Sequence, residues 1–465
     1  MSDTFRIGIV SGKLGDVDGV SLEVDKWIGV FNTLGHEVFT IAGYYRSPVE
    51  NVPESHQFTI PAIRFGSDRQ TLYERHFFPH LSKVPPRDTE NERRDLIEQL
   101  QSEGQETGEL IYEQLADNRI DVLIGENTNA MPMTLLGGIG LYHVATEKRV
   151  ATIFHHHDFW WERSRFSNSH IESLLNRIMP PVDISHEHVV ISSYAGHILS
   201  SLKRVQPHIV PNCEDFDNPI TIDDYNSSFR SDLGFSADDI LVVQPTRVVR
   251  RKRIEDSVRL VGRFLGRYPQ YRERLHYIVS LYQGDEPDEN YVAEIRELAE
   301  SLGVRLHFIS ERVASVRGTD AVGRKLYTNR DVLANADIVT YLPIWEGFGN
   351  ALLEAIAARV PVVTTTYLVY KTDISVAGIR NIEIRDRYDE DGRLVIDDAV
   401  LEAMQRVLEH PGERAELVER NFEAARREFG LSTLSDRLAT VFAAYGDEIR
   451  ASRMRIRKSS ARYSV

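Results

Sequence analysis

Short apolar strands alternate with helical segments along the whole chain, and this alternation constrains the fold more than any other feature. In the first half, apolar runs of strand length lie at 5–10, 37–42, 121–124, 150–154 and 188–191. The pattern starts again in the second half, with runs at 240–244, 275–280, 305–309, 337–342 and 360–364. Helical segments between such strands are typical of α/β folds with parallel sheets.

The length of the chain and one polar segment indicate two domains. The chain has 465 residues, and a single core rarely grows beyond about 250–300 residues. The stretch 208–235 is polar and acidic and separates the two series of strands. We therefore predict a first domain over 1–212 and a second over 213–439, with a final helix at about 440–465.

Composition excludes several classes of protein. The formal net charge of −15 disfavours a general nucleic-acid partner. The single cysteine, Cys213, excludes an internal disulfide and fits a reducing cytoplasm. The first residues lack a signal-peptide pattern, and no apolar run approaches the ~20 residues that span a bilayer. The sequence predicts a soluble cytoplasmic protein.

The last sixteen residues, from Arg450 onward, contain six basic residues and no acid. A solvated tail is the simpler interpretation. A peripheral contact with anionic lipid or with an acidic partner is the alternative. The sequence leaves open whether the chain forms a homodimer.

The segment 338–366 carries the most specific pattern, because it reads as a strand, a glycine-containing turn, a helix and a second strand. Glu346 ends the first strand, and Glu354 lies inside the helix. Ligands of open parallel sheets bind at the carboxyl ends of strands, and a helix start offers N–H groups to an anion. Gly347 and Gly349 allow close backbone approach. We predict that Glu346 binds sugar hydroxyls and Glu354 a ribose, so the ligand is a nucleotide sugar.

This segment resembles the Glu–seven residues–Glu signature of retaining glycosyltransferases, above all of glycosyltransferase family 4. The matching residues are Glu346, Gly347, Phe348, Gly349, Glu354, Ala355, Pro361, Val362 and Val363. The resemblance implies the GT-B architecture: two Rossmann-like domains with parallel sheets facing a cleft, and a C-terminal helix that crosses back to the first domain. It also implies that the donor binds the second domain through Phe348, Gly349, Asn350 and Glu354.

A basic segment at the end of strand 240–244 is the candidate phosphate site. Arg247 and Lys252 fall on the family's phosphate-binding pair, and two cations there would neutralise a departing diphosphate. The alternative is a solvated basic helix start, because Arg250, Arg251 and Arg253 make the run dense.

Two loops complete the predicted donor site. In the turn after 305–309, Ser310 and Arg312 are candidates for reading the nucleobase. The glycine loop after the first strand resembles the family's first-loop motif, in which Gly19 carries over as a donor-binding position. In the same loop, Asp16 and Asp18 spell a DxD, which we interpret as a turn because GT-B enzymes generally need no metal there.

Three consecutive histidines, 155–157, end a strand of the first domain. They invite a metal interpretation, but successive strand residues point to opposite faces, so we predict no metal site. His157 and Asp158 resemble the family's His-Asp pair, in which the histidine faces the donor sugar. A buried core histidine is the alternative.

The residues that follow are the candidate acceptor site. Aromatic rings stack on sugars, and arginines bind carboxylate or phosphate. We predict acceptor contacts from Trp160, Trp161, Arg163 and Arg165. An aromatic lid packed on the domain, with exposed arginines, is equally compatible with the pattern.

Together these features predict a retaining hexosyltransferase. It would move a hexose from a nucleotide-diphosphate sugar, such as UDP-glucose or GDP-mannose, to a hydroxyl of a small soluble, anionic sugar or sugar acid. Catalysis would rest on His157, Glu346, Arg247 and Lys252, with no obligatory cofactor or metal. The alternatives are a sugar-nucleotide epimerase, a glycan phosphorylase, a glycosyltransferase with a lipid-linked acceptor, or a non-catalytic binding protein.

Overall fold

The computed structural model describes residues 4–16, 18–282 and 289–460. The chain divides into two compact units: unit 1 comprises 1–211 with 434–465, and unit 2 comprises 212–433. The predicted domain limits, 212 and 439, lie one and six residues from the observed limits of 211 and 433.

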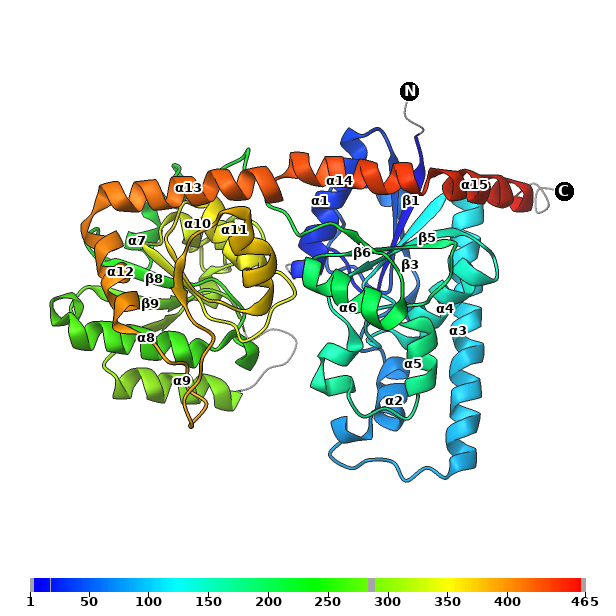
Figure 1. The fold of residues 1–465 in the computed structure, drawn as a ribbon, viewed down its shortest axis with the longest axis horizontal. Helices are drawn as coiled ribbons and strands as arrows, with labels where there is room; N and C mark the ends of the chain where they lie inside the picture. The colour runs from blue at the N-terminus through cyan, green and yellow to red at the C-terminus, as the bar shows by residue number, and fades with distance from the viewer. Residues whose placement is uncertain (1–3, 17, 283–288, 461–465) are drawn as a thin grey trace. The chain divides into compact units, whose positions relative to one another are not determined.

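Unit 1 contains a parallel sheet whose described strands run in the order β3-β2-β1-β4-β5-β6-β7 (Figure 1). These strands are β1 (Arg6–Ser11), β2 (Glu37–Ala42), β3 (Gln57–Thr59), β4 (Val122–Glu126), β5 (Ala151–His156), β6 (His186–Val190) and β7 (His208–Ile209). The helices that connect them are α1 (Gly19–Thr33), α2 (Asp68–Phe77), α3 (Glu90–Asn118), α4 (Leu135–Thr146), α5 (Glu172–Ile178) and α6 (Ser193–Lys203).

Unit 2 repeats the architecture, with described strands in the order β10-β9-β8-β13-β14-β15, all parallel. These strands are β8 (Ile240–Gln244), β9 (Leu275–Val279), β10 (Arg305–Phe308), β13 (Ile338–Tyr341), β14 (Val362–Thr365) and β15 (Ile382–Ile384). The helices are α7 (Phe229–Asp232), α8 (Ile254–Arg267), α9 (Glu289–Ser301), α10 (Asn329–Ala334), α11 (Asn350–Ala357), α12 (Asp398–Glu409) and α13 (Pro411–Phe429). A small antiparallel pair is formed by β11 (Gly318–Thr319) and β12 (Lys325–Leu326).

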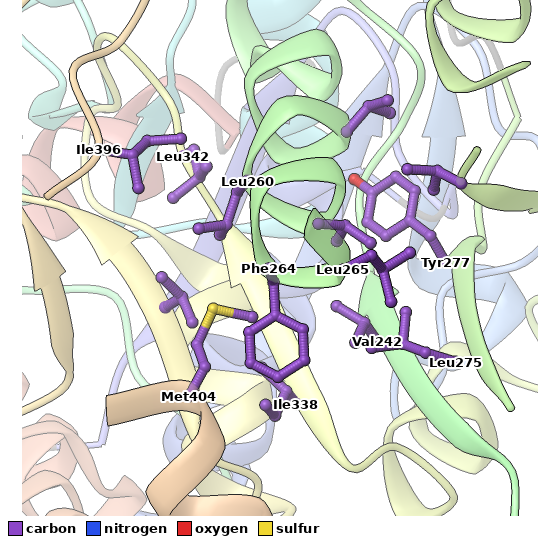
Figure 2. Packing of buried hydrophobic residues seen from close by; sticks show 14 of the residues in the cluster. Val242, Leu260, Phe264, Leu265, Leu275, Tyr277, Ile338, Leu342, Ile396 and Met404 are labelled. Carbon is purple, nitrogen blue, oxygen red and sulfur yellow. The ribbon is translucent and has the colours of Figure 1, made fainter. Parts of the chain in front are cut away.

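The core of unit 2 shows why the apolar runs form strands. All five residues of β8 are buried, as expected for a parallel strand that is covered on both faces. Helix α8 turns one apolar stripe toward this sheet, where Phe264 packs in one cluster with Ile338 of β13 and Met404 of α12 (Figure 2). These buried faces fix the strand ends from which the candidate site is built.

The C-terminal segment returns to unit 1, as the resemblance implied. Helices α14 (Leu431–Ala444) and α15 (Gly446–Ser460) bring Tyr445 and Ser452 to β5, where their hydroxyls accept hydrogen bonds from the N–H groups of Thr152 and Ala151 at 3.0 and 3.1 Å. Arg453 pairs with Asp121 at 2.9 Å. Part of the basic tail therefore stabilises unit 1, whereas Arg462 lies outside the described residues. No helix in the described part of the chain is both long and apolar enough to span a membrane.

Candidate active site

The turn between β13 and α11 has a backbone that only glycine adopts easily. Gly349 caps the N-terminus of α11 with φ of 135°. A Cβ atom at this position would lie 2.4 Å from the hydroxyl oxygen of Tyr367, which donates to the carbonyl of Phe348 at 2.7 Å. Phe348 itself is buried and meets Phe429 edge to face. The turn is therefore held in one shape, with the first N–H groups of α11 at the carboxyl end of the sheet.

Glu346 is the centre of a buried acid–cation cluster just before this turn. The residue is only 9% exposed. Its Oε1 accepts hydrogen bonds from Arg251 Nη1 at 2.6 Å and from Lys252 Nζ. Burial by itself raises the pKa of Glu346, but Arg251 and Lys252 outweigh it and lower this pKa to about 2. The carboxylate is therefore ionised and shared by two cations.

The two cations respond to the same surroundings. Burial, together with the charges of Arg251 and Arg247, lowers the pKa of Lys252 to about 8 against the opposing attraction of Glu346. Arg247 is half-buried. Arg251 and Lys252 thus contact Glu346 directly, and Arg247 lies close enough for its charge to act on Lys252. Sequence analysis treated Arg251 as part of a dense basic run, and only the fold shows which of these cations reach Glu346.

Glu354 and Asn350 on α11 have polar partners that sequence analysis missed. Asn329 Nδ2 donates to Glu354 Oε2 at 3.0 Å, and Ser280 Oγ donates to Asn329 Oδ1 at 2.8 Å. Asn212 Nδ2 donates to Asn350 Oδ1 at 2.7 Å. Asn329 begins a helix directly after a strand-like segment, and a polar residue at such a position is the signal that could have indicated it.

The predicted nucleobase turn, Ser310–Arg312, forms a short 3₁₀ helix. Arg312 is buried, and its guanidinium donates to the carbonyls of Lys325 and Asp232 at 3.0 and 3.1 Å. These bonds correct the predicted role of the Arg312 side chain, because it is engaged within unit 2. Ser310 is half-buried.

In unit 1, the adjacent strands β4 and β5 place Glu126 between two histidines. Glu126 pairs in register with His155, and its Oε2 lies 2.9 Å from His155 Nδ1. Its Oε1 lies 2.6 Å from Nε2 of His157, and the backbone N–H of His157 donates to Asn127 Oδ1 at 3.1 Å. Glu126 and His157 are 2% and 9% exposed. Sequence analysis missed Glu126, although an acid ending a strand beside the histidine strand is a readable signal.

The charges in this cluster follow from burial and contact. Burial acts to lower the pKa of His157, but the neighbouring Glu126 outweighs it and raises this pKa. Burial raises the pKa of Glu126, but His155 and His157 overcome it and lower this pKa to about 2. Burial lowers the pKa of His155. Glu126 is thus ionised between the two rings, and its contact favours the protonated form of His157.

Among the described residues, Glu126, His155 and His157 are also the group that could hold a metal ion, since their ligand atoms lie within 4.8 Å of one another. The sequence argument against a metal was incomplete, because strand alternation separates His156 from its neighbours but leaves His155 and His157 on one face.

His156 lies on the opposite face of the sheet, where its Nε2 is 3.0 Å from Nδ1 of His188 on β6. Burial holds the pKa of His156 well below its usual range and lowers the pKa of His188 to about 3. Both rings are therefore neutral members of the core of unit 1.

We expect these buried histidines to make the protein sensitive to acid. The folded state keeps His188 neutral down to about pH 3, whereas the unfolded chain binds the proton near pH 6.5. Above about pH 6.5 this histidine therefore takes nothing from the free energy of unfolding. As the pH falls below that value, the free energy of unfolding decreases by up to about 1.4 kcal/mol per pH unit for each buried neutral histidine. Urea unfolding of His188→Gln should show a shallower loss between pH 6.5 and 4 than the parent protein. His80→Gln, at an exposed histidine, is the control, and equal slopes for the parent and His188→Gln would contradict the interpretation.

The predicted acceptor residues are mostly used within unit 1. Trp160 is buried in a hydrophobic cluster, and its indole N–H donates to the carbonyl of Met179 at 3.0 Å. This corrects the prediction for Trp160, since its ring has little surface left for a sugar. Trp161 is half-buried and stacks on Phe159 at 4.7 Å between ring centroids.

The two arginines of this segment pair with acids. Arg163 donates to Asp158 through Nε at 2.7 Å and through Nη2, and Arg165 donates to Glu74 at 2.8 Å. Both arginine side chains are about one-third exposed. They therefore keep a polar edge toward solvent, which matches the alternative of a packed aromatic segment with partly exposed arginines.

The first loop is a capped turn. Asp18 accepts from the N–H groups of Val20 and Ser21 at the start of α1, where Gly19 is the first helical residue. Lys13 lies 3.0 Å from Asp16 and 3.2 Å from Asp18. The carboxylates of the DxD thus cap a helix and bind a lysine, as expected for a turn.

Two parallel-sheet Rossmann-like units, one with an acid–cation cluster at a helix N-terminus, are the arrangement of a GT-B glycosyltransferase. The family model described as "Glycosyl transferases group 1" matches residues 226–375. Mannosylglucosylglycerate synthase of Thermotoga maritima is 33% identical over 449 residues, covering 93% of this chain and 99% of the relative. The chain therefore belongs to the group 1 glycosyltransferases.

Other relatives agree with this assignment. Mannosylglucosylglycerate synthase of Petrotoga mobilis is 28% identical, and the match covers 87% of this chain and 93% of the relative. Among solved structures, sucrose-phosphate synthase from Thermosynechococcus elongatus matches with a TM-score of 0.62 at 14% identity, over 95% of this chain and 98% of that one. Anabaena HepE in complex with UDP-glucose matches with a TM-score of 0.61 at 12% identity, over 95% of this chain and 100% of that one. The solved structures confirm the predicted GT-B fold.

Proposed function

We propose that this protein is a retaining hexosyltransferase that transfers mannose from a nucleotide-diphosphate sugar to a hydroxyl of a sugar acid of the glucosylglycerate type. The observation that carries the proposal is the buried Glu346, which holds Arg251 and Lys252 beside the start of α11. The names of the relatives supply the sugar and the acid. No metal or cofactor is required in this proposal.

The cation cluster fits a diphosphate that leaves with negative charge. In the free protein, Glu346 neutralises part of the charge of Arg251 and Lys252. A bound diphosphate provides a second anion for the same cations, and the helix start adds N–H donors. Since the negative charge grows as the bond to the sugar breaks, these groups stabilise the transition state more than the bound substrate.

The reaction is proposed to follow a front-face route. The bond between the anomeric carbon and the diphosphate oxygen breaks, and the acceptor hydroxyl oxygen bonds to the same face of that carbon. The acceptor proton moves to the departing diphosphate oxygen, so no protein base is needed. In this scheme Glu346 orients the sugar hydroxyls, Glu354 the ribose, and His157 contributes a polar contact to a sugar.

The arginines of unit 1 support an anionic acceptor. Arg163 and Arg165 pair with acids but remain partly exposed, and arginine binds a carboxylate in two-pronged fashion. Trp161 offers a half-buried aromatic face next to them. These three residues are the proposed acceptor contacts.

The test combines donors and acceptors with the purified full-length chain. GDP-mannose, UDP-glucose and ADP-glucose are each incubated with glucosylglycerate, with glycerate and without acceptor, in the presence of EDTA, and the products are followed by NMR. We expect one donor to give an α-linked product with glucosylglycerate only, in undiminished yield with EDTA. An altered nucleotide sugar without acceptor would instead indicate an epimerase, a β-linked product would contradict retention, and loss of turnover with EDTA would contradict the metal-free scheme.

A further inference from the structure

Gln244 is a fully buried side-chain amide at the carboxyl end of β8, to which sequence analysis gave no role. Two residues earlier, Val242 pairs in register with Tyr277 of β9 and with Ile338 of β13. These three side chains belong to the apolar cluster on one face of the sheet (Figure 2). Residues two apart on a strand share a face, so Gln244 and Thr340 lie on this face too. A polar group there costs free energy unless it is hydrogen-bonded.

Both polar atoms of the Gln244 amide have partners. Oε1 accepts from the Tyr277 hydroxyl at 2.8 Å and from Thr340 Oγ1 at 3.4 Å. Nε2 donates to the main-chain carbonyl of Lys252 at 3.1 Å and to Thr246 Oγ1 at 3.3 Å. Because a carbonyl oxygen can only accept, the nitrogen of the amide must face Lys252 and the oxygen must face Tyr277. These contacts therefore give the amide one orientation.

This orientation matters because Lys252 is held at both of its ends. Lys252 is the last residue of a short 3₁₀ helix, Arg250–Lys252, and carbonyls at a helix end lack partners within the helix. Gln244 supplies a partner for the carbonyl. At the other end, Nζ donates to Glu346 and lies 5.2 Å from the centroid of the Tyr341 ring. The amide thus sets the point from which the lysine side chain starts toward the acid–cation cluster.

The network gives direction more than stability. A leucine would fill the same space, as the apolar neighbours of Gln244 fill theirs. A buried amide adds little net free energy, since its bonds within the protein replace bonds with water. Its bonds are directional, however, and through Gln244, Tyr277 and Thr340 three adjacent strands fix one carbonyl of the turn that carries the cations.

We propose that Gln244 is a positioning residue, which holds the main chain at Lys252 so that the ammonium group of this lysine meets both Glu346 and the diphosphate of a bound nucleotide sugar. The part that concerns the diphosphate rests on the proposed function. Tyr277 has a supporting role, because its hydroxyl holds Oε1 and so keeps Nε2 turned toward Lys252. This role explains an amide at the end of an otherwise apolar strand.

The test is a double-mutant cycle, measured by calorimetric titration of the full-length chain with UDP, GDP and ADP. Gln244→Leu should raise the Kd of the tightest-binding nucleotide about tenfold, because Lys252 loses the contact that holds its carbonyl. In the Lys252→Ala background the same replacement should change this Kd less than about twofold, since the residue through which Gln244 acts is absent. Equal effects in the two backgrounds overturn the proposal.

Tyr277→Phe is the milder variant, which decides the question if Gln244→Leu does not fold. It keeps the ring and removes only the hydroxyl that holds Oε1. The Kd should rise about threefold, and this rise should disappear in the Lys252→Ala background. A Kd that Tyr277→Phe changes equally in both backgrounds overturns the proposal.

The matched control is Asn421→Leu, which removes another buried amide of unit 2. Asn421 Oδ1 accepts from the backbone N–H of Arg380 at 2.8 Å, and its Nδ2 donates to the carbonyl of the same residue at 2.9 Å. The variant should unfold at a lower urea concentration and keep the Kd of the parent protein. A Kd raised as much as in Gln244→Leu would show that any lost amide in unit 2 has this effect, and would overturn the proposal.

Kinetics separate this inference from the proposed function. Gln244→Leu should lower kcat/KM for the donor about tenfold or more, while the KM for the acceptor changes less than about twofold. A chain that shows the coupling to Lys252 in nucleotide binding but transfers no sugar would support the inference and refute the proposed function. Sugar transfer without the coupling would do the reverse. A chain that binds none of the three nucleotides refutes both.

Discussion

Replacing Glu346 by glutamine is expected to lower kcat/KM for sugar transfer by about 10²–10³-fold without weakening the binding of the nucleoside diphosphate. The carboxylate is buried and holds Arg251 and Lys252. Glutamine keeps the shape but removes the charge that orients the sugar hydroxyls. Because the two cations then lose their anionic partner, their attraction for the diphosphate should stay equal or increase. Steady-state kinetics and calorimetric titration with the nucleoside diphosphate measure the two effects separately.

Lys252→Ala provides the contrasting variant, since it removes a cation from the same cluster. It should weaken diphosphate binding and lower turnover together. Lys371→Ala, at an exposed lysine of unit 2, should change neither. If Glu346→Gln weakened diphosphate binding as strongly as Lys252→Ala, the carboxylate would belong to the phosphate site itself, and its proposed contact with the sugar would be wrong.

Replacing Gly349 by alanine is expected to destabilise unit 2 by about 3 kcal/mol or more, through backbone strain and a steric clash. The backbone has φ of 135°, and the new Cβ would stand 2.4 Å from the Tyr367 hydroxyl. Moving that hydroxyl breaks its bond to the Phe348 carbonyl and changes the turn before α11. Donor binding should therefore fall with stability, as measured by urea unfolding with and without the nucleoside diphosphate.

Two further variants separate strain from clash at this turn. Gly392→Ala also sits at positive φ, 71°, but its Cβ would meet nothing within 4 Å, so it should cost about 1 kcal/mol. Gly349→Ala combined with Tyr367→Phe removes the clashing oxygen and should regain part of the loss. Equal costs for Gly349→Ala and Gly392→Ala would show that the contact with Tyr367 carries no energy.

The central strands of both sheets are predicted well because their burial leaves a local mark. Strand β2 matches the predicted run 37–42, and β8 matches 240–244. Parallel strands covered on both faces must be apolar throughout, which the sequence shows directly. The short edge strands β3, β7 and β15 were not predicted, because they owe their extended shape to pairing with a neighbour rather than to their own residues.

The site residues divide in the same way. Glu346, Glu354, Arg247 and Lys252 stand in a contiguous motif or a fixed spacing, so the sequence indicates them. Arg251, Asn329 and Glu126 meet their partners across 95, 25 and 29 or more residues of chain. Nothing local distinguishes Arg251 from the cations beside it. Trp160 and Arg312 show the reverse case, in which a residue typical of ligand sites is used for packing and for holding backbone carbonyls.

By itself, the sequence determined the repeated α/β architecture, the glycine turn before α11 and the acids and cations that a nucleotide sugar needs, since these depend on periodicity and on residues close along the chain. The tertiary structure alone decided which cations reach Glu346 and which carboxylate meets His157. Those contacts depend on strand order and register, which bring the ends of β4 and β5, and of β8 and β13, next to each other. Ion pairing and burial act over a few ångströms of space, and only the folded chain sets those distances.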